Sequence, residues 1–476
     1  MKRVFSIIML FLTAIYTADA KVEPAPVFAD HMVLQQQTEA TVWGKAKPNA
    51  KVTITTTWSK TKTVVYADAE GKWSGSIATP VAGGPYEITF NDGEKLTLKN
   101  VLIGEVWICS GQSNMEMQMK GFSGQPIEGA TELIVSAKPS TLIRSCNLKR
   151  ERSLETQDIC PATWYEHTPE GVHEASATAY FFAKKLYETL DVPVGIINVS
   201  WGGTPIEAWM NPELLKKEFA DELNLNHLDT KVWPENMPYK APGVLYNGMM
   251  HSIVPFTAKG FIWYQGCDNR ARFEQYKRLQ PAFVQMLRDE WGNQDMGFYF
   301  TQIAPYKYDD PEGRTGGYMM WAQAQTLELI PHSGMATTHD AGDLTCIHPA
   351  DKKTVGYRLA YLALANDYGF EVLDVNPPIY ESFEVKDGKA YVRFKVGPKG
   401  LSPISQELGG FELAGEDGVF YPATARVQND RKVLRVKCPE VPDPVAVRYG
   451  MKNWSVATVF NCYGIPVSPF RTDDWK

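Results

Sequence analysis

Residues 101–119, VLIGEVWICSGQSNMEMQM, constrain the fold more than any other segment of this 476-residue chain. Their first half is rich in β-branched and aromatic residues, as buried strands are, and it runs directly into a Gly-Gln-Ser-Asn turn. A serine at the carboxyl end of a central strand is held on a rigid element, and the glycine before it lets the backbone turn sharply. Ser113 is therefore a candidate nucleophile, although a Gly-x-Ser tripeptide alone is more often a simple polar turn.

The segments on either side of a central region have the pattern of β modules. Residues 21–100 contain short alternating strands at 40–44, 52–56 and 62–66, separated by turns, which indicates a small antiparallel β-sandwich. After the Asn-Pro-Pro turn at residues 376–378, strands resume at 390–396 and 445–449. We therefore expect an N-terminal β-sandwich over residues 21–100 and a C-terminal β module, also sandwich-like, over residues 371–476.

Residues 101–370 alternate between strand and helix periods. Helical spacing occurs at 176–190, 274–291, 321–329 and 352–368, and apolar strands occur at 194–199, 261–264, 297–303 and 334–338. The strand at 194–199 is apolar at every position but one, as expected of a strand that is covered on both faces. This alternation predicts an α/β domain with a doubly wound parallel sheet.

Charge and cysteine content limit the classes of partner. The net charge is −7 and no block of Lys or Arg occurs, which argues against a nucleic-acid or anionic-membrane partner and favours a neutral ligand. No CxxC or HExxH motif is present, so we expect no metal site. Seven cysteines permit disulfides but leave one thiol unpaired.

The first twenty residues have the features of an export signal. Lys2 and Arg3 precede an apolar run at residues 4–16 and the small-residue triplet Ala18-Asp19-Ala20. We expect a signal peptide at residues 1–20, cleavage after Ala20 and a periplasmic or secreted protein. The apolar run is too short to span a bilayer, so no membrane span is expected after cleavage.

Four strand ends of the α/β region carry chemically distinctive residues. Since ligands bind outside the carboxyl ends of the strands in such sheets, these segments should meet at one site. Ser113 follows the first strand, Gly203 lies in the loop after the next, Gln265 and Asn269 offer amide donors, and His348 lies in a loop with two carboxylates. Together they supply a nucleophile, a general base, an acid to orient it and donors for an oxyanion, as acyl transfer requires.

The chain resembles a known family in these same motifs. GEVWICSGQSNMEM, WGGTPIEAW, FIWYQG and IHPADK occur in this order and are similar to motifs of the sialate O-acetylesterases, a family of SGNH-hydrolase carbohydrate esterases. The resemblance implies a flavodoxin-like SGNH core, catalysis without a metal or cofactor, and removal of O-acetyl groups from an acetylated sugar or glycan. It also implies that Ser113 is the nucleophile, His348 the base, and Gly203 and Asn269 oxyanion donors, with Gln265 as a further donor.

The chain departs from this family at two positions. In much of the family a glutamate follows the glycine of the third motif, and an aspartate lies two or three residues before the histidine. Here Cys267 occupies the first position and no carboxylate occupies the second. We expect Asp343, five residues before His348, to orient the imidazole; a backbone carbonyl in a Ser-His dyad, or Asp340, is the alternative.

Cys267 and Cys346 belong to loops that should border one crevice, so a disulfide between them is a second expectation, weighed equally against two buried thiols. Three functions remain open at this point. They are an O-acetylesterase acting on sialic acids, the same chemistry on acetylated xylan or other hemicellulose, and a carbohydrate-binding protein whose catalytic site has decayed. The sequence leaves the oligomeric state open.

Overall fold

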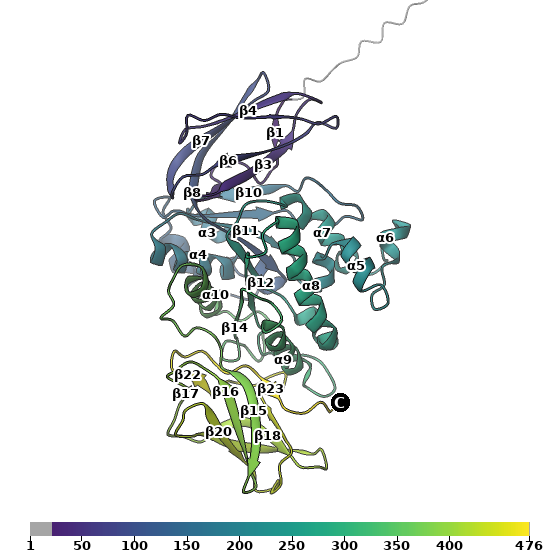
Figure 1. Cartoon of the computed structure of the whole chain (residues 1–476), viewed down its shortest axis with the longest axis vertical. Coiled ribbons are helices and arrows are strands. Elements are labelled where there is room, and N and C mark those ends of the chain that lie inside the picture. The colour runs from purple at the N-terminus through teal and green to yellow at the C-terminus, as the bar shows by residue number, and fades with distance from the viewer. Residues whose placement is uncertain (1–20, 476) are drawn as a thin grey trace, which may run out of the picture.

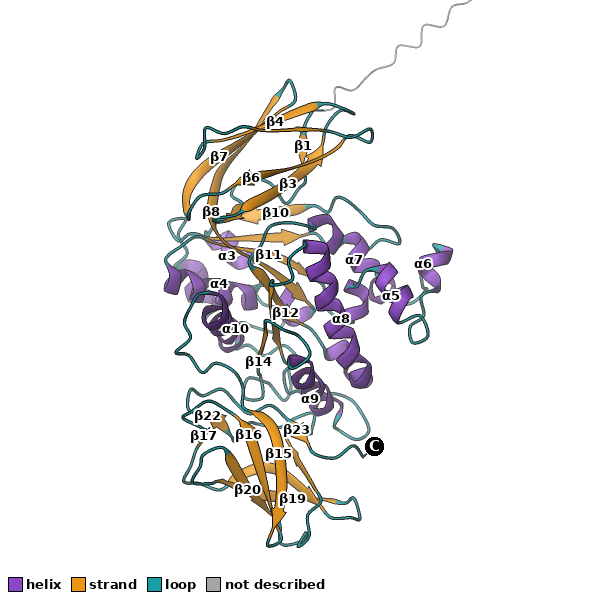
Figure 2. Cartoon of the chain, viewed as in Figure 1, coloured by secondary structure: helices purple, strands orange, loops and turns teal. Residues whose placement is uncertain are grey.

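The computed structural model describes residues 21–475, so the expected signal peptide lies outside the described residues. Figure 1 shows three parts stacked along the long axis, with a β module at each end and an α/β domain between them. Strands make up most of the two end modules, whereas helices occur mainly in the middle part (Figure 2). This arrangement agrees with the order of strand and helix patterns along the chain.

The N-terminal module consists of two sheets that share an apolar core. One sheet has the order β1-β3-β6, and the other contains β2, β4, β5, β7 and the first part of β8. Val42, Trp73 and Phe90 are buried between them. The strands are β1 (Glu23–Pro24), β2 (Val33–Gln35), β3 (Glu39–Lys45), β4 (Lys51–Thr56), β5 (Thr63–Tyr66), β6 (Lys72–Ala78), β7 (Gly83–Asn91) and β8 (Lys95–Gly111).

Two features of this module differ from the expectation of a separate antiparallel sandwich. The short strand β2 pairs with β8 in parallel, from Val33 opposite Leu102 to Gln35 opposite Gly104. Strand β8 is also longer than expected, because its first part pairs with β7 and its second part enters the central sheet. Residue 100, the expected domain boundary, therefore lies inside one continuous strand.

The central sheet has the strand order β10-β9-β11-β8-β12-β13-β14. Its strands are parallel except β10, which is antiparallel to β9 at one edge. Numbered along the chain, β8, β11, β12, β13 and β14 have the order 2-1-3-4-5, the doubly wound order found in flavodoxin-like sheets. The remaining strands are β9 (Ile143–Leu148), β10 (Ala162–Tyr165), β11 (Val194–Ser200), β12 (Gly260–Tyr264), β13 (Gly297–Thr301) and β14 (Ser333–Ala336).

Helices cover both faces of this sheet (Figure 1). Helices α4 (Ala177–Leu190) and α10 (Lys352–Asp367) pack together on one face, where Phe182 and Leu359 join Trp107 in an apolar core. Helices α8 (Phe273–Trp291) and α9 (Thr315–Leu327) cover the other face. Shorter helices are α1 (Ser113–Glu116), α2 (Ala130–Val135), α3 (Pro169–Glu174), α5 (Pro212–Glu218), α6 (Asn226–Thr230) and α7 (Val244–Gly248), with 3₁₀ turns η1 (Ile206–Trp209), η2 (Pro238–Lys240), η3 (Met250–Ile253) and η4 (Cys267–Arg272).

The C-terminal module contains a seven-stranded sheet and a two-stranded one. The larger sheet has the order β15-β16-β20-β19-β18-β21-β23, and β17 pairs with β22. Its core includes Phe394, Leu413 and Val447. The strands are β15 (Ile379–Lys386), β16 (Lys389–Lys395), β17 (Leu401–Ser402), β18 (Leu408–Ala414), β19 (Phe420–Val427), β20 (Val433–Lys437), β21 (Ala446–Tyr449), β22 (Phe460–Asn461) and β23 (Phe470–Arg471).

Helix α9 begins six residues before the start expected from the sequence. Its first turn contains Gly316 and Gly317, and glycines usually weaken a helix. At Gly317 an added Cβ would lie 2.6 Å from the backbone of Met451 and Lys452. The glycine is therefore used for close packing of α9 against the C-terminal module, which the local sequence pattern does not indicate.

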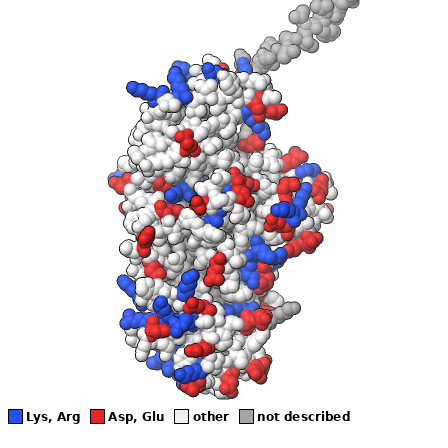
Figure 3. All heavy atoms as spheres, viewed as in Figure 1, with Lys and Arg blue, Asp and Glu red and all other residues white. Residues whose placement is uncertain are grey.

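Acidic and basic side chains are interspersed over most of the face shown in Figure 3, rather than gathered in one large patch of a single sign. No helix within residues 21–475 combines the length and the apolar character needed to cross a membrane. Within the same residues, no three His, Cys, Asp or Glu side chains come together as a metal site would require.

Candidate active site

Ser113 lies where β8 leaves the middle of the central sheet, between β11 and β12. Gly111 ends the strand with φ of 140°, and a Cβ there would lie 2.2 Å from the carbonyl oxygen of Tyr264. Only glycine therefore fits beside β12 at this position. The next residue, Gln112, donates its backbone N–H to the same carbonyl, and α1 begins at Ser113. The turn is fixed by main-chain contacts, as expected of a nucleophile on a rigid strand end.

The structure brings Ser113 and His348 together although 235 positions separate them in the chain. Ser113 Oγ lies 2.7 Å from His348 Nε2. On the other side of the ring, His348 Nδ1 lies 2.6 Å from Gln125 Oε1 and donates to it. With the proton on Nδ1, Nε2 is free to accept the serine proton, which is the tautomer that a general base requires. Phe122 packs its ring edge-on against the imidazole, with centroids 5.2 Å apart.

Asp343 does not contact His348, contrary to the sequence-based expectation. Its Oδ1 accepts hydrogen bonds from the backbone N–H groups of Thr345 and Cys346 and from the Thr345 hydroxyl. These bonds lower the pKa of Asp343 and tie the carboxylate to its own loop. Asp340, the alternative, forms a bidentate pair with Arg358. Gln125, a neutral amide, therefore occupies the position where a triad acid was expected.

The pKa of His348 is lowered to about 4. Burial is the larger cause, and the nearby positive charge of Lys352 is the smaller one. Among the residues that the structure describes, the hydrogen-bond partners of the ring are Gln125 and Ser113, and no carboxylate offsets these effects. The imidazole is therefore neutral at the pH at which it would act as a base, and its protonated form receives little stabilisation from the site.

The Gly203 loop lies next to Ser113, the candidate nucleophile. A Cβ on Gly202 would lie 3.1 Å from Ser113 Cβ, and the Gly202 N–H donates to Glu116 Oε2 at 2.8 Å. Gly203 has φ of 68°, in the left-handed region that favours glycine. Within residues 21–475 neither the Gly203 N–H nor the Ser113 N–H donates a hydrogen bond to another residue. Two backbone donors are thus available beside the nucleophile.

Gln265 and Asn269 do not reach the surface of the site, which corrects the expectation that their amides face an oxyanion. Both side chains are 0% exposed. Gln265 Nε2 donates to the Thr204 carbonyl and to Asn269 Oδ1. Asn269 accepts from the Ile206 N–H and donates to Glu207. The bonds that these amides make hold the loop that follows Gly203 in place, and Gln265 Oε1 is buried without a partner.

Cys267 and Cys346 are free thiols, so the expected disulfide is absent. Cys267 lies 3.3 Å from the Tyr308 hydroxyl in a buried position, where burial raises the pKa of its thiol to about 11. The Cys346 thiol donates to the carbonyl of His348. Each sulfur points to a partner other than the second cysteine, which corresponds to the alternative of two unpaired thiols.

Aromatic and charged side chains border the site beyond the Gly203 loop. Trp201 and Tyr239 stack with centroids 5.3 Å apart and planes 6° apart, and Arg150 lies over Trp201. Arg150 forms an ion pair with Glu116, and Lys240 forms one with Asp268 at 2.7 Å. Arg150 and Lys240 are thus each already paired with a carboxylate.

Two residues at the site were not found by sequence analysis. Gln125 follows a Ser-Gly pair in an irregular loop, and nothing in its local pattern distinguishes it from other polar loop residues. Glu116 belongs to the Ser-Asn-Met-Glu stretch that contains Ser113, so its position three residues after the candidate nucleophile is the signal that could have indicated it.

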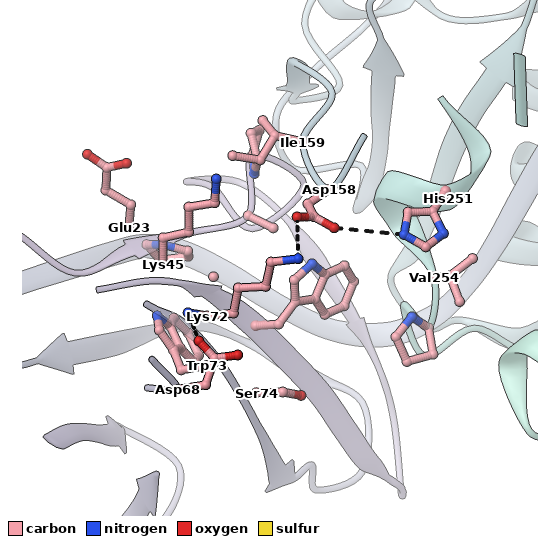
Figure 4. Close-up of a pocket in the computed structure, with 16 residues that line it drawn as sticks. Glu23, Lys45, Asp68, Lys72, Trp73, Ser74, Asp158, Ile159, His251 and Val254 are labelled. Carbon is pink, nitrogen blue, oxygen red and sulfur yellow. Dashed lines mark hydrogen bonds and ion pairs between the residues drawn. The ribbon is translucent and has the colours of Figure 1, made fainter. Parts of the chain in front are cut away.

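A separate cavity of about 520 Å³ lies between the N-terminal module and the α/β domain. In Figure 4, Asp158 faces Lys72 from the N-terminal module and His251 from the α/β domain. None of Ser113, Gly203 and His348 lines this cavity.

Comparisons with known proteins agree with this geometry. The family model described as "Carbohydrate esterase, sialic acid-specific acetylesterase" matches residues 103–364. The sialate O-acetylesterase of Homo sapiens is 31% identical over 389 residues, which cover 74% of this chain and 72% of that protein. The sialate O-acetylesterase of Rattus norvegicus is 28% identical over 415 residues, covering 75% of each chain.

The same agreement is found among solved structures. The crystal structure of a carbohydrate acetylesterase from Xanthomonas citri superimposes with a TM-score of 0.85 and 32% sequence identity, covering 96% of this chain and all of that one. The matched region therefore includes both β modules as well as the α/β domain.

Proposed function

Because this chain belongs to the family of sialic acid-specific carbohydrate esterases and is thus a carboxylic ester hydrolase, we propose that it is an SGNH-type serine esterase that removes O-acetyl groups from carbohydrates. The observation that carries the proposal is the 2.7 Å hydrogen bond from the Ser113 hydroxyl to His348 Nε2. A serine bonded to a neutral imidazole can transfer its proton as it attacks an ester.

In the proposed reaction, Ser113 Oγ attacks the acetyl carbonyl while His348 Nε2 takes its proton. The N–H groups of Ser113 and Gly203 hold the oxyanion that forms. His348 then returns the proton to the departing sugar hydroxyl, which leaves an acetyl-serine. Water attacks this ester with His348 again acting as base, and acetate is released. Throughout, Gln125 Oε1 keeps the proton of the imidazole on Nδ1.

We further propose that the substrate is an O-acetylated sialic acid or glycan, because the curated relatives carry that name. One observation favours a second candidate, an acetylated neutral sugar such as that of hemicellulose. A sialic acid carries a carboxylate, yet Arg150 and Lys240 are already neutralised by Glu116 and Asp268. The stacked Trp201 and Tyr239 rings offer a face for a sugar ring of either kind.

An acetate-release assay tests the proposal. We expect the wild-type protein to release acetate from either 9-O-acetyl-N-acetylneuraminic acid or acetylated xylo-oligosaccharides, and Ser113→Ala to release none. Ser123→Ala, which changes an exposed serine before Gln125, is the matched control and should keep full activity. Absence of acetate from every acetylated sugar would favour a carbohydrate-binding protein instead. The substrate with the higher kcat/KM decides between the two candidates.

The export prediction also stays a proposal. We propose a periplasmic or secreted location on the basis of the signal-like residues 1–20. N-terminal sequencing of the protein from its native compartment should begin at Lys21.

A further inference from the structure

Lys352 is unusual because it is a buried lysine at the N-terminus of a helix. Its side chain is 1% exposed, and it is the first residue of α10, where the helix dipole disfavours a positive charge. The N-cap of this helix, Asp351, accepts from the Thr354 N–H instead of pairing with Lys352. Within residues 21–475 its ammonium group donates to Asn114 Oδ1 and to the Pro349 carbonyl, and neither acceptor is a carboxylate. Burying a charge without an opposite charge beside it lowers the stability of the fold, so we expect this lysine to have a function that offsets the loss.

The contacts of Lys352 lead directly to the catalytic base. Its Nζ donates to the Pro349 carbonyl at 2.7 Å and to Asn114 Oδ1 at 2.6 Å. The amide nitrogen of Asn114 in turn donates to the Ile347 carbonyl at 3.0 Å. Lys352 and Asn114 therefore hold the carbonyl groups on both sides of His348.

The same contacts are anchored to the nucleophile. Asn114 directly follows Ser113, is 1% exposed, and accepts from the Thr178 hydroxyl through its backbone carbonyl. The Ser113 turn and the His348 loop are thus joined by two hydrogen bonds in series, Lys352 to Asn114 and Asn114 to Ile347. No such link exists through Asp343, which bonds only within its own loop.

We propose that Lys352 is a positioning residue of the esterase, which together with Asn114 holds the His348 loop so that the imidazole stays within hydrogen-bond distance of Ser113. This proposal rests on the proposed function of the Ser113–His348 pair. Lys352 and Asn114 contact the His348 loop from behind the ring. They thereby supply part of the positioning that an acid supplies in a catalytic triad.

The electrostatics give Lys352 a second effect on the base. Burial lowers its pKa to about 7, opposed by Asp351 on its own helix, Cys346 on the His348 loop and Cys267 from η4. When Lys352 is protonated, its charge disfavours the imidazolium that forms as Ser113 attacks. When it is neutral, its amine still has two N–H groups for Asn114 and Pro349. The contacts therefore survive deprotonation while the opposing charge disappears, so turnover should increase as pH rises through about 7.

Kinetics of Lys352 variants test the positioning role. We expect Lys352→Met to lower kcat about a hundredfold, as a displacement of about 1 Å can, with little change in KM. Lys352→Gln should retain more activity than Lys352→Met because its amide keeps two donors. The control is Lys353→Met, which removes the adjacent exposed lysine and should match the wild type. If Lys352→Met does not fold, Lys352→Gln and Asn114→Ala replace it. Wild-type kcat in the folded variants would overturn the proposal.

Two further readouts separate positioning from simple structural support. The rise of kcat/KM through pH about 7 should be present in the wild type and Lys353→Met but absent in Lys352→Met. In the inactive Ser113→Ala background, NMR titration should show a higher pKa for His348 when Lys352→Met is added. An unchanged pKa would overturn the electrostatic coupling. The NMR measurement needs no turnover, so it tests the role of Lys352 even if the protein is not an esterase. Wild-type activity, measured in parallel, tests the esterase assignment separately.

Discussion

The two halves of the site are built in different ways. The nucleophile half, which consists of the proposed nucleophile Ser113 and the Gly203 loop, is placed by main-chain bonds at the ends of β8 and β11. The base half, which consists of the proposed base His348 and Gln125, lies on two irregular loops and is held by side chains. Main-chain ladders are insensitive to most side-chain changes, whereas side-chain contacts are lost with a single substitution. A single substitution in the base half can therefore reduce activity and leave the fold intact more easily than one in the nucleophile half.

The largest expected effect comes from removing either reacting group. Ser113→Ala and His348→Ala should each lower kcat by more than about a thousandfold, since members of a catalytic unit lose most of its activity together. Both side chains lie at the surface of the site, so thermal unfolding should be little changed. Acetate release and circular dichroism melts check this. Either variant keeping more than about a hundredth of wild-type kcat would contradict its assignment.

The second largest effect is expected from low pH, which should protonate His348 and abolish activity. His348 must be neutral to accept a proton, and its pKa is lowered to about 4. After the partial decrease through pH about 7 that Lys352 causes, activity should therefore level off and then decline about tenfold per pH unit below about 4. A kcat/KM profile, measured where circular dichroism shows a folded protein, checks this. A decline of tenfold per pH unit that already begins near 6.5, with no level region below it, would indicate a histidine without the lowered pKa.

Gln125 should have an intermediate effect. Gln125→Ala removes one hydrogen bond to Nδ1 of His348, worth about 1.4 kcal/mol, and should lower kcat about tenfold. Gln125→Glu should instead raise the pKa of His348 by adding a carboxylate, and should match or exceed wild-type kcat at neutral pH. Kinetics and NMR titration of both variants are the measurements. Equal activity in Gln125→Ala would show that the ring is oriented without the amide.

Asp343 should matter little. Asp343→Asn keeps an oxygen that can accept from the Thr345 and Cys346 N–H groups, so we expect kcat within about threefold of wild type and a small loss of stability. A loss of several orders of magnitude would instead indicate the wrong imidazole tautomer and restore Asp343 as the triad acid.

The smallest effect is expected at the cysteines. Cys267 and Cys346 each contact another group, so the wild-type enzyme should have the same activity with and without reductant. Peptide mapping without reductant should recover both as free thiols. A cross-linked peptide containing both would restore the disulfide hypothesis.

The sequence predicted the two halves to different extents, because one depends on local patterns and the other on contacts between distant loops. Residues 101–119 combine a strand pattern with a turn, and both depend on local preferences, so the strand and the turn that carries Ser113 were predicted correctly. His348 was located by motif resemblance. Gln125 was not, because its contact with His348 spans 223 positions and depends on the path of two loops. Burial of Gln265 and Asn269 was missed because an amide motif looks the same whether it faces a substrate or supports a loop.

The fold shows the same division. The alternation of periods was enough to predict the doubly wound domain and the two β modules. The continuity of β8 and the early start of α9 were not predicted, because both depend on partners distant in sequence. A boundary drawn from local pattern alone cannot detect that one strand serves two sheets.

The length of β8 has a consequence for the order in which the protein is made. Its first part pairs with β7 across a loop of three residues, whereas its second part waits for β11 and β12, which follow about 90 and 150 positions later. Local pairs close faster than distant ones, and N-terminal segments emerge first from the ribosome. The hairpin can therefore form while the α/β domain is still being synthesised, and its free end then serves as the template on which the central sheet assembles around the nucleophile.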